Sequence, residues 1–289
     1  MKLLNQLFWS SRPISWINTA FPFAAAYFLI TGRVDLNLVL GTLFFLIPYN
    51  LLMYGVNDVF DYESDLRNPR KGGIEGALLH PKWHKPTLLW SFGLCVPFLA
   101  YLYAVGSVPA NLWLTLFVFT VIAYSAKGLR FKEIPFVDSL TSASHFVGPM
   151  IYGIALAGGD LSATNVILFI ASFTLWGVAS HAFGAVQDVK ADREANISSI
   201  ATVIGARATS RFAFAAYLAA AILVGLSGWP SGLSAVAALP YLWIVGPHLN
   251  ITDENCESAN RGWKQFMKLN YLAGFIVTMI LIWVALTRA

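Results

Sequence analysis

The sequence predicts an all-α integral membrane protein with nine transmembrane helices, and three observations support that fold class. Hydrophobic residues make up 57% of the 289 residues, charged residues only 12%, and the mean hydropathy is +0.63, far from the averages of soluble proteins. Nine apolar stretches are each about long enough to cross a hydrocarbon core of roughly 30 Å. Basic residues gather on one side of these stretches, as the positive-inside rule requires.

The apolar stretches follow one another with short polar connections. The first comes after a short basic leader, but its apolar run is too long for a secretory signal core and is expected to stay as a helix. The longest polar connection, 58–86, is too short for a soluble domain, so residues 1–289 are expected to form a single integral membrane domain. The nine stretches lie at 14–31, 37–57, 87–106, 109–126, 136–157, 163–187, 209–228, 232–250 and 266–287.

The distribution of lysine and arginine predicts the orientation in the cell membrane. With a cytoplasmic N-terminus, only Arg33 and Arg288 of the 19 basic residues fall outside. The others lie in inner connections or at inner helix ends, which also places the C-terminus outside. The formal net charge of +4 reflects this topology and does not indicate nucleic-acid binding.

The end of the second stretch carries the motif NDVFDYESD, residues 57–65. Nothing between Val56 and Leu66 is a helix breaker, so we expect one helix from residue 37 to residue 66. On that helix Asn57, Asp61 and Asp65 stack at i, i+4 and i+8 on one face. Asp58 lies off this face and Glu63 points away from it.

Stacked carboxylates repel one another unless a cation lies between them. Mg²⁺ prefers oxygen ligands and commonly joins one or two carboxylates to substrate phosphates, so this face predicts a metal-bridged diphosphate site. Asp188 and Asp192, in QDVKADRE, provide a second acidic face at i and i+4. The alternative is that both clusters are solvated helix ends, although carboxylates there oppose the helix dipole.

A diphosphate also needs cationic partners. The loop YSAKGLRFK, residues 124–132, provides Arg130 and Lys132, which either grip phosphate oxygens or only anchor the inner membrane surface. The segment RNPRKGG adds further candidate contacts in a glycine-containing loop that could close over a site, namely Arg67, Arg70 and Lys71. His145 and His181 are secondary candidates, because a lone histidine is more often a packing residue.

Together these motifs resemble the UbiA superfamily of intramembrane prenyltransferases. The resemblance rests on NDxxDxxxD at Asn57 to Asp65, a YSxxxxRxK-like loop at Tyr124 to Lys132, and DxxxD at Asp188 to Asp192. It implies nine helices around a central cavity and a cytoplasmic active site that uses Mg²⁺. It also implies Mg²⁺ ligands at Asn57, Asp61, Asp65, Asp188 and Asp192, catalytic roles for Asp61, Asp188, Arg130 and Lys132, and substrate contacts at Arg12, Asn18, Tyr124 and Lys127, besides Arg67, Arg70 and Lys71. Lys127-Gly128 departs from the prolines of many relatives, which puts the role of Lys127 in doubt.

Within that superfamily, SRPISWINTAFPFAAAY (11–27) and NDVFDYESDLRNPRKGGIEGA (57–77) are similar to the lycopene elongases. The resemblance implies transfer of prenyl units from dimethylallyl diphosphate to the ends of lycopene, in the lipid bilayer, toward longer carotenoids. Attack by a terminal double bond leaves a tertiary cation that loses a proton or takes up water, and the sequence leaves both fates open. One alternative is an aromatic, quinone-type acceptor. Another is an ion transporter, which would place acids deep within the spans.

Overall fold

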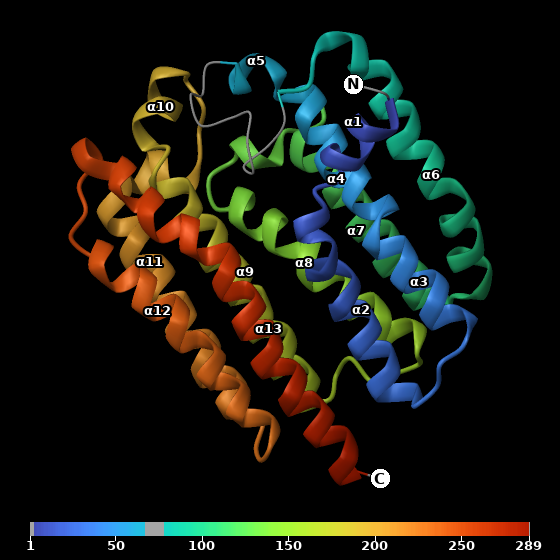
Figure 1. Ribbon diagram of the computed structural model, residues 1–289. Helices are drawn as coiled ribbons and strands as arrows, with labels where there is room; N and C mark the ends of the chain where they lie inside the picture. The colour runs from blue at the N-terminus through green and yellow to red at the C-terminus, as the bar shows by residue number, and fades with distance from the viewer. Residues whose placement is uncertain (1–2, 67–77, 289) are drawn as a thin grey trace. The chain divides into compact units, whose positions relative to one another are not determined.

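The protein is helical throughout the part of the chain that the structure describes. The structure is a computed structural model, and it describes residues 3–66 and 78–288. Over these residues it contains helices and no strand, which confirms the all-α prediction (Figure 1). The chain divides into two compact units, Met1–Phe131 with Ser144–Leu161, and Lys132–Ala143 with Ser162–Ala289.

The first unit contains the helices that precede residue 131. They are α1 (Leu3–Ser10), a 3₁₀ turn (Pro13–Ser15), α2 (Trp16–Thr31), α3 (Leu36–Leu46), α4 (Pro48–Phe60), α5 (Tyr62–Asp65), a 3₁₀ turn (Pro81–Trp83), α6 (His84–Val105) and α7 (Val108–Ser125). Helix α8 (Val137–Leu156) begins in the second unit and ends in the first.

The second unit contains the remaining helices. A 3₁₀ turn (Phe131–Glu133) leads into it from the last residue of the first segment of the first unit. The others are α9 (Thr164–Val186), α10 (Val189–Glu194), α11 (Ile200–Gly225), a 3₁₀ stretch (Ser231–Ala238), α12 (Leu239–Val245), a 3₁₀ turn (Gly246–His248), the 3₁₀ segment Asp253–Ala259 and α13 (Asn260–Arg288).

Buried aromatic side chains form the core of each unit. In the first, Phe45 packs against Phe44 and Tyr49 with ring centroids 4.9 and 5.0 Å apart, and all three are buried. In the second, Tyr217 stacks on Tyr241 at 5.1 Å. Edge and offset contacts of this kind add to the stabilisation from burial.

Seven helical stretches are long and apolar enough to cross a membrane, within the described residues. They are Leu3–Thr31, Leu36–Phe60, Pro81–Val105, Val108–Ser125, Thr164–Val186, Ile200–Gly225 and Lys268–Thr287. The expected span at 136–157 coincides with α8, which is rich in hydroxyl-bearing residues. The count of nine spans therefore stays a prediction, as does the central cavity.

The expectation of one helix from 37 to 66 is wrong, because the chain breaks twice. The first break, between α3 and α4, follows from Pro48, which has no backbone N–H to continue the helix. The Asn50 amide donates to the carbonyls of Phe45 and Leu46 at 2.9 and 3.1 Å, and the Thr19 hydroxyl also donates to Phe45 at 2.7 Å. Buried side chains thus satisfy backbone groups that lipid could not.

The second break lies inside the acidic motif. Helix α4 ends at Phe60, and Asp61 (φ −99°, ψ 0°) separates it from the short helix α5. The expected span at 232–250 is likewise divided, into the Ser231–Ala238 stretch, α12 and the Gly246–His248 turn. Pro240 and Pro247 stand near the starts of the last two pieces, where a missing N–H is tolerated.

Candidate functional site

Residues 57–65, the first acidic motif, lie at the end of α4 in the first unit. Asp61 is buried, and its carboxylate accepts a hydrogen bond of 2.6 Å from the Asn57 amide. The same amide donates to the Ser125 hydroxyl at the end of α7, at 2.9 Å. Both amide hydrogens of Asn57 are therefore engaged, which leaves its carbonyl oxygen as the group that can approach a cation. The predicted face shared by Asn57 and Asp61 is present.

Arg130 reaches the first acidic motif from the loop after α7. Its guanidinium lies 3.6 Å from the Asp61 carboxylate and donates to the Phe60 carbonyl at 3.4 Å. The Arg130 side chain is 29% exposed, so a charged group arriving from solvent can also reach it. The arrangement places a fork-shaped cation beside the carboxylate that the sequence marks as a metal ligand.

Arg12 also reaches this motif, but it binds Asp58. The Arg12 guanidinium donates to the Asp58 carboxylate at 2.7 Å, and their side chains are only 17% and 0% exposed. The guanidinium also lies 4.5 Å from the centroid of the Tyr54 ring, a favourable cation–π distance. Asp58, which the sequence places off the metal face, is thus the partner of an arginine expected to bind substrate.

The two arginines that reach the motif share an unusual backbone. Arg12 and Arg130 have φ values of 50° and 44°, in the left-handed region that costs side-chain-bearing residues about 1–3 kcal/mol each. Such strain persists only where surrounding contacts offset it, and it concentrates at functional sites. Phe136 and Asn196 also have positive φ values, of 68° and 56°, so this backbone feature is consistent with a site at the motif but does not single it out.

Replacing Asp58 by alanine should destabilise the fold by about 3 kcal/mol, the lower end of the range for breaking a buried pair, because Arg12 keeps some exposure. Thermal unfolding of detergent-purified protein measures the effect. Glu63→Ala is the matched control, since it removes the same charge from an exposed side chain of the same motif and should cost less than about 0.5 kcal/mol. Equal unfolding temperatures for the two variants would contradict a structural role for the pair.

The other predicted substrate contacts fall in several environments. Tyr124 packs edge-on against the His145 ring at 5.2 Å, Lys127 is exposed in the turn after α7, and Asn18 is half-buried on α2. Lys132, half-buried in the Phe131–Glu133 turn, belongs to the second unit. Arg67, Arg70 and Lys71 lie outside the described residues, and so does the side chain of Asp65.

The turn after α7 explains the departure at Lys127-Gly128. Gly128 has a φ of +92°, which a proline, fixed near −65°, cannot adopt. The Ala126 carbonyl accepts hydrogen bonds from the Leu129 and Arg130 amides, both at 3.1 Å. Glycine therefore gives this chain its own form of tight turn immediately before Arg130.

The second acidic motif, residues 188–192, begins at Asp188, the N-cap of α10, and continues into that helix in the second unit. The Asp192 amide donates to the Asp188 carbonyl at 2.8 Å, so the two residues are one helical turn apart, as their spacing predicts. Both side chains are half-buried. The preceding residue, Gln187, is buried and accepts a hydrogen bond of 2.5 Å from the Asn260 amide on α13.

Several polar residues around the second motif were missed by the sequence reasoning. Buried Asp138 on α8 accepts from the Ile200 amide at 2.7 Å and from Ser139, whose hydroxyl lies 3.0 Å from Nδ1 of His181. Arg193 and Asp253 form an ion pair at 2.6 Å. No local signal marks the contacts of Asp138 with Ile200, of Ser139 with His181 and of Arg193 with Asp253, because these partners are 62, 42 and 60 residues apart along the chain.

The oxygen-bearing side chains of the two acidic motifs suit a metal ion whose remaining ligands come from a substrate. Within residues 3–66 and 78–288, no three His, Cys, Asp or Glu side chains form a group that could hold a metal ion. Asn57 and Asp61 offer an amide and a carboxylate oxygen, and Asp188 and Asp192 offer carboxylates. Mg²⁺ usually takes one or two carboxylates and completes its octahedron with water and phosphate oxygens. The few side-chain oxygens of each motif are therefore enough for it.

Comparison with known proteins gives consistent matches over most of the chain. Residues 19–272 match the model of the UbiA prenyltransferase family. A C(50) beta-cyclic carotenoids biosynthesis protein of Dietzia sp. (strain CQ4) is 59% identical over 97% of this chain, and the chain spans 65% of that relative's length. A lycopene elongase/hydratase of Corynebacterium glutamicum (strain ATCC 13032) is 54% identical over 98% of both chains.

Solved structures show the same fold. A UbiA homologue from Archaeoglobus fulgidus, bound to DMAPP and Mg²⁺, superposes with a TM-score of 0.69 at 20% identity and covers 96% of this chain and 99% of its own. A UbiA homologue from Aeropyrum pernix K1 gives a TM-score of 0.70 at 17% identity, with 93% and 98% covered. The resemblance drawn from the three sequence motifs is confirmed.

Proposed function

This chain belongs to the UbiA prenyltransferase family, and we propose that it transfers a prenyl group from dimethylallyl diphosphate to lycopene in a Mg²⁺-dependent reaction that lengthens the carotenoid. That it is a multi-pass membrane prenyltransferase follows from the family and from its apolar helices. The observation that supports lycopene as the acceptor is the identity with a lycopene elongase/hydratase along nearly the whole of both chains.

In this proposal each acidic motif contributes Mg²⁺ ligands. Asn57, Asp61 and Asp65 serve in the first motif, and Asp188 and Asp192 in the second. The hydrogen bond from Asn57 to Asp61 supports the first set, because it holds two oxygen-bearing side chains one helical turn apart. Bound Mg²⁺ supplies positive charge that neutralises the departing diphosphate and so assists ionisation of the allylic C–O bond.

The cationic side chains orient the donor. Arg130 and Lys132 grip diphosphate oxygens, and the position of Arg130 beside Asp61 supports its part. Tyr124, Asn18 and Lys127 are proposed further substrate contacts, together with Arg67, Arg70 and Lys71. For Arg12, the ion pair with Asp58 favours a role in holding the first acidic motif, from which the guanidinium can still attract the diphosphate.

The acceptor forms the new C–C bond and then loses or gains atoms to give a neutral product. The C–O bond breaks first, its electron pair leaves with the diphosphate, and a terminal double bond of lycopene then attacks the allylic cation, so that the new C–C bond leaves a tertiary cation. Loss of a proton gives an alkene, whereas addition of water with loss of a proton gives an alcohol. An aromatic acceptor would instead lose a ring proton.

A lycopene-accumulating host that expresses this chain should form carotenoids one or two prenyl units heavier than lycopene. Chromatography with mass spectrometry identifies them and separates alkene from alcohol products. The same host expressing Asp61→Ala is the control and should retain only lycopene. Prenylation of a phenolic acid by membrane extract, with lycopene left unchanged, would overturn the proposed acceptor.

We also propose that the protein lies in the cell membrane as one integral membrane domain, with its N-terminus and both acidic motifs cytoplasmic and its C-terminus outside. The 17 basic residues assigned to the inner side support this orientation, and a family match from residue 19 to residue 272 supports one domain. A transporter is a remote alternative. It is disfavoured because the acids of both motifs lie at helix ends, and flux of labelled substrate across vesicles would reveal it.

A further inference from the structure

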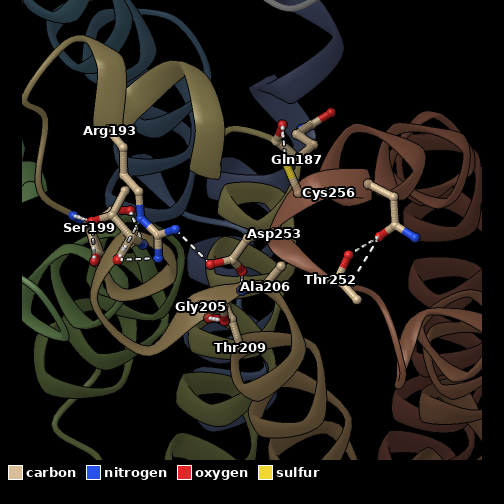
Figure 2. Close-up of polar contacts among 11 residues, drawn as sticks. Gln187, Arg193, Ser199, Gly205, Ala206, Thr209, Thr252, Asp253 and Cys256 are labelled. Atoms are coloured by element: carbon tan, nitrogen blue, oxygen red, sulfur yellow. Dashed lines mark hydrogen bonds and ion pairs between the residues drawn. The ribbon is translucent and has the colours of Figure 1, made fainter.

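The second acidic motif lies on a helix that cannot hold its own position. Helix α10 (Val189–Glu194) has only six residues, of which only Val189 is buried. Isolated helices shorter than about 12–15 residues are marginal in water, so contacts with other elements must fix the direction of α10. The contacts that do so involve the 3₁₀ segment Asp253–Ala259 (Figure 2).

This segment contacts the chain on both sides of the motif. Before the motif, the Cys256 thiol donates to the Gln187 carbonyl at 3.8 Å, and Cys256 is fully buried. After the motif, Arg193 donates to the Asp253 carboxylate at 2.6 Å. Figure 2 shows the Arg193 side chain extending from α10 toward Asp253. The motif therefore lies between two contacts with one short segment.

Arg193 makes a second contact that fixes its direction. Its Nε and Nη2 atoms donate to the Thr202 carbonyl at 3.1 and 2.8 Å, in the first turn of α11. The guanidinium thus binds a carbonyl with one edge and a carboxylate with another nitrogen. This geometry depends on the planar fork of arginine, which lysine lacks.

Asp253 in turn binds the backbone of α11. Gly205 (φ 81°, ψ 162°) interrupts this helix, and the Ala206 amide, at the start of the next turn, donates to the Asp253 carboxylate at 2.7 Å. An anion at such a helix start is favourable. The Ala206 amide, and after it the Arg193 guanidinium, lowers the pKa of Asp253 below its ordinary value, so the carboxylate is charged at neutral pH.

Asp138 and Ser199 fix the far end of the connection. The Asp138 carboxylate accepts from the Ile200 amide, and the Ser199 hydroxyl caps α11 through the Thr202 amide at 3.3 Å. The chain that leads from α10 into α11 is therefore held by side chains of α8, of the α11 N-cap Ser199 and of the Asp253–Ala259 segment.

We propose that Arg193 and Asp253 are positioning residues that hold α10 so that Asp188 and Asp192 can bind Mg²⁺ and diphosphate. The proposal rests on the proposed function of the second acidic motif and adds residues that lie outside it. The Arg193 and Asp253 side chains are 44% and 35% exposed, so as an exposed ion pair they contribute only about 0–1 kcal/mol to global stability. Their effect should therefore appear in the metal site more than in unfolding.

The test compares Arg193→Ala and Asp253→Asn with Arg211→Ala. Arg211 is a matched control, because it is an exposed arginine of α11 that donates to the Leu249 carbonyl and the Asn250 side chain, both at 3.0 Å. Its hydrogen bonds join α11 to residues 249 and 250 and involve no residue of α10. Amide exchange of the 187–197 region is measured as Mg²⁺ is titrated in the presence of dimethylallyl diphosphate, alongside the Mg²⁺ dependence of turnover.

Arg193→Ala and Asp253→Asn should each need about tenfold more Mg²⁺ for half-maximal protection and half-maximal turnover, which is the lower end of the loss seen when residues that orient a metal site are removed. Their unfolding temperatures should stay close to that of the wild type, and Arg211→Ala should shift neither midpoint more than about twofold. Arg193→Lys should recover only part of the shift, because it restores charge without the fork. In the double variant the shifts should not add, since both residues act through one contact.

The outcomes separate this inference from the proposed function. If the wild type transfers prenyl groups, and if Arg193→Ala and Asp253→Asn have the same Mg²⁺ midpoints as the wild type, the positioning role is wrong and the proposed function stands. If the midpoint for protection shifts as expected in the two variants but the wild type makes no prenylated product, the positioning role of Arg193 and Asp253 is upheld and the proposed function fails. Absence of any Mg²⁺-dependent protection in the wild type would overturn the positioning role, and if the wild type also made no prenylated product, the proposed function would fail as well.

Discussion

Replacement of Asp61 by alanine should lower prenyl transfer by about a thousandfold or more, which corresponds to about 4 kcal/mol in the activation barrier. The Asp61 carboxylate is the point where the Asn57 amide and the Arg130 guanidinium converge, so its loss removes a proposed metal ligand and the partner of a diphosphate contact. Asp188→Ala should have a comparable effect through the second acidic motif. Turnover of labelled dimethylallyl diphosphate by purified protein measures both losses.

The controls for this prediction separate chemistry from folding. Membrane insertion of Asp61→Ala and Asp188→Ala should match that of the wild type, because neither substitution removes apolar packing. Glu63→Ala, in the same motif but exposed, should keep most of the activity. Asp58→Ala should lose activity together with stability, because its partner is Arg12. Equal loss of turnover in Glu63→Ala and Asp61→Ala would show that the motif acts through its overall charge.

Removal of Mg²⁺ should weaken binding of the diphosphate donor by several kcal/mol, at least a hundredfold in Kd by the usual conversion. Without the cation, the carboxylates of the motifs would repel phosphate oxygens across a short gap. Lycopene carries no charge, so its binding should persist in EDTA. Equilibrium binding of labelled donor and of lycopene to detergent-purified protein, with and without chelator, measures both effects.

Restoring Mg²⁺ to the chelated protein should return donor affinity to its starting value, which controls for damage by EDTA. Donor binding that is unchanged by chelation would contradict metal-bridged binding at either motif. Tight binding of a phenolic acid in place of lycopene would favour the quinone-type alternative.

Local patterns predicted the helical class and the chemistry of the first acidic motif. Apolar runs of sufficient length require helices in a bilayer, because every backbone group must be bonded within the segment. The i, i+4 spacing of Asn57 and Asp61 likewise predicted their shared face, because a helix repeats every 3.6 residues. That face survives the interruption at Asp61, since the contact lies within the last turn of α4.

The same patterns failed where the backbone departs from regular helix. Pro48 interrupts the second apolar stretch, and the side chains of Asn50 and Thr19 donate hydrogen bonds to carbonyls at that break. Whether a proline kinks, breaks or begins a helix depends on which side chains can reach the freed carbonyls. Hydropathy averages over such positions and therefore predicted one helix.

The sequence by itself determined the membrane class, the family, and the acidic motifs with their oxygen donors, because each depends on residues close together in the chain. Only the tertiary structure decided which arginine pairs with which carboxylate. Arg12 and Asp58 are 46 residues apart, and Arg193 and Asp253 are 60 apart. Pairing at such separations depends on how helices pack and on which charges are buried together, since a carboxylate removed from water needs a partner wherever the fold provides one.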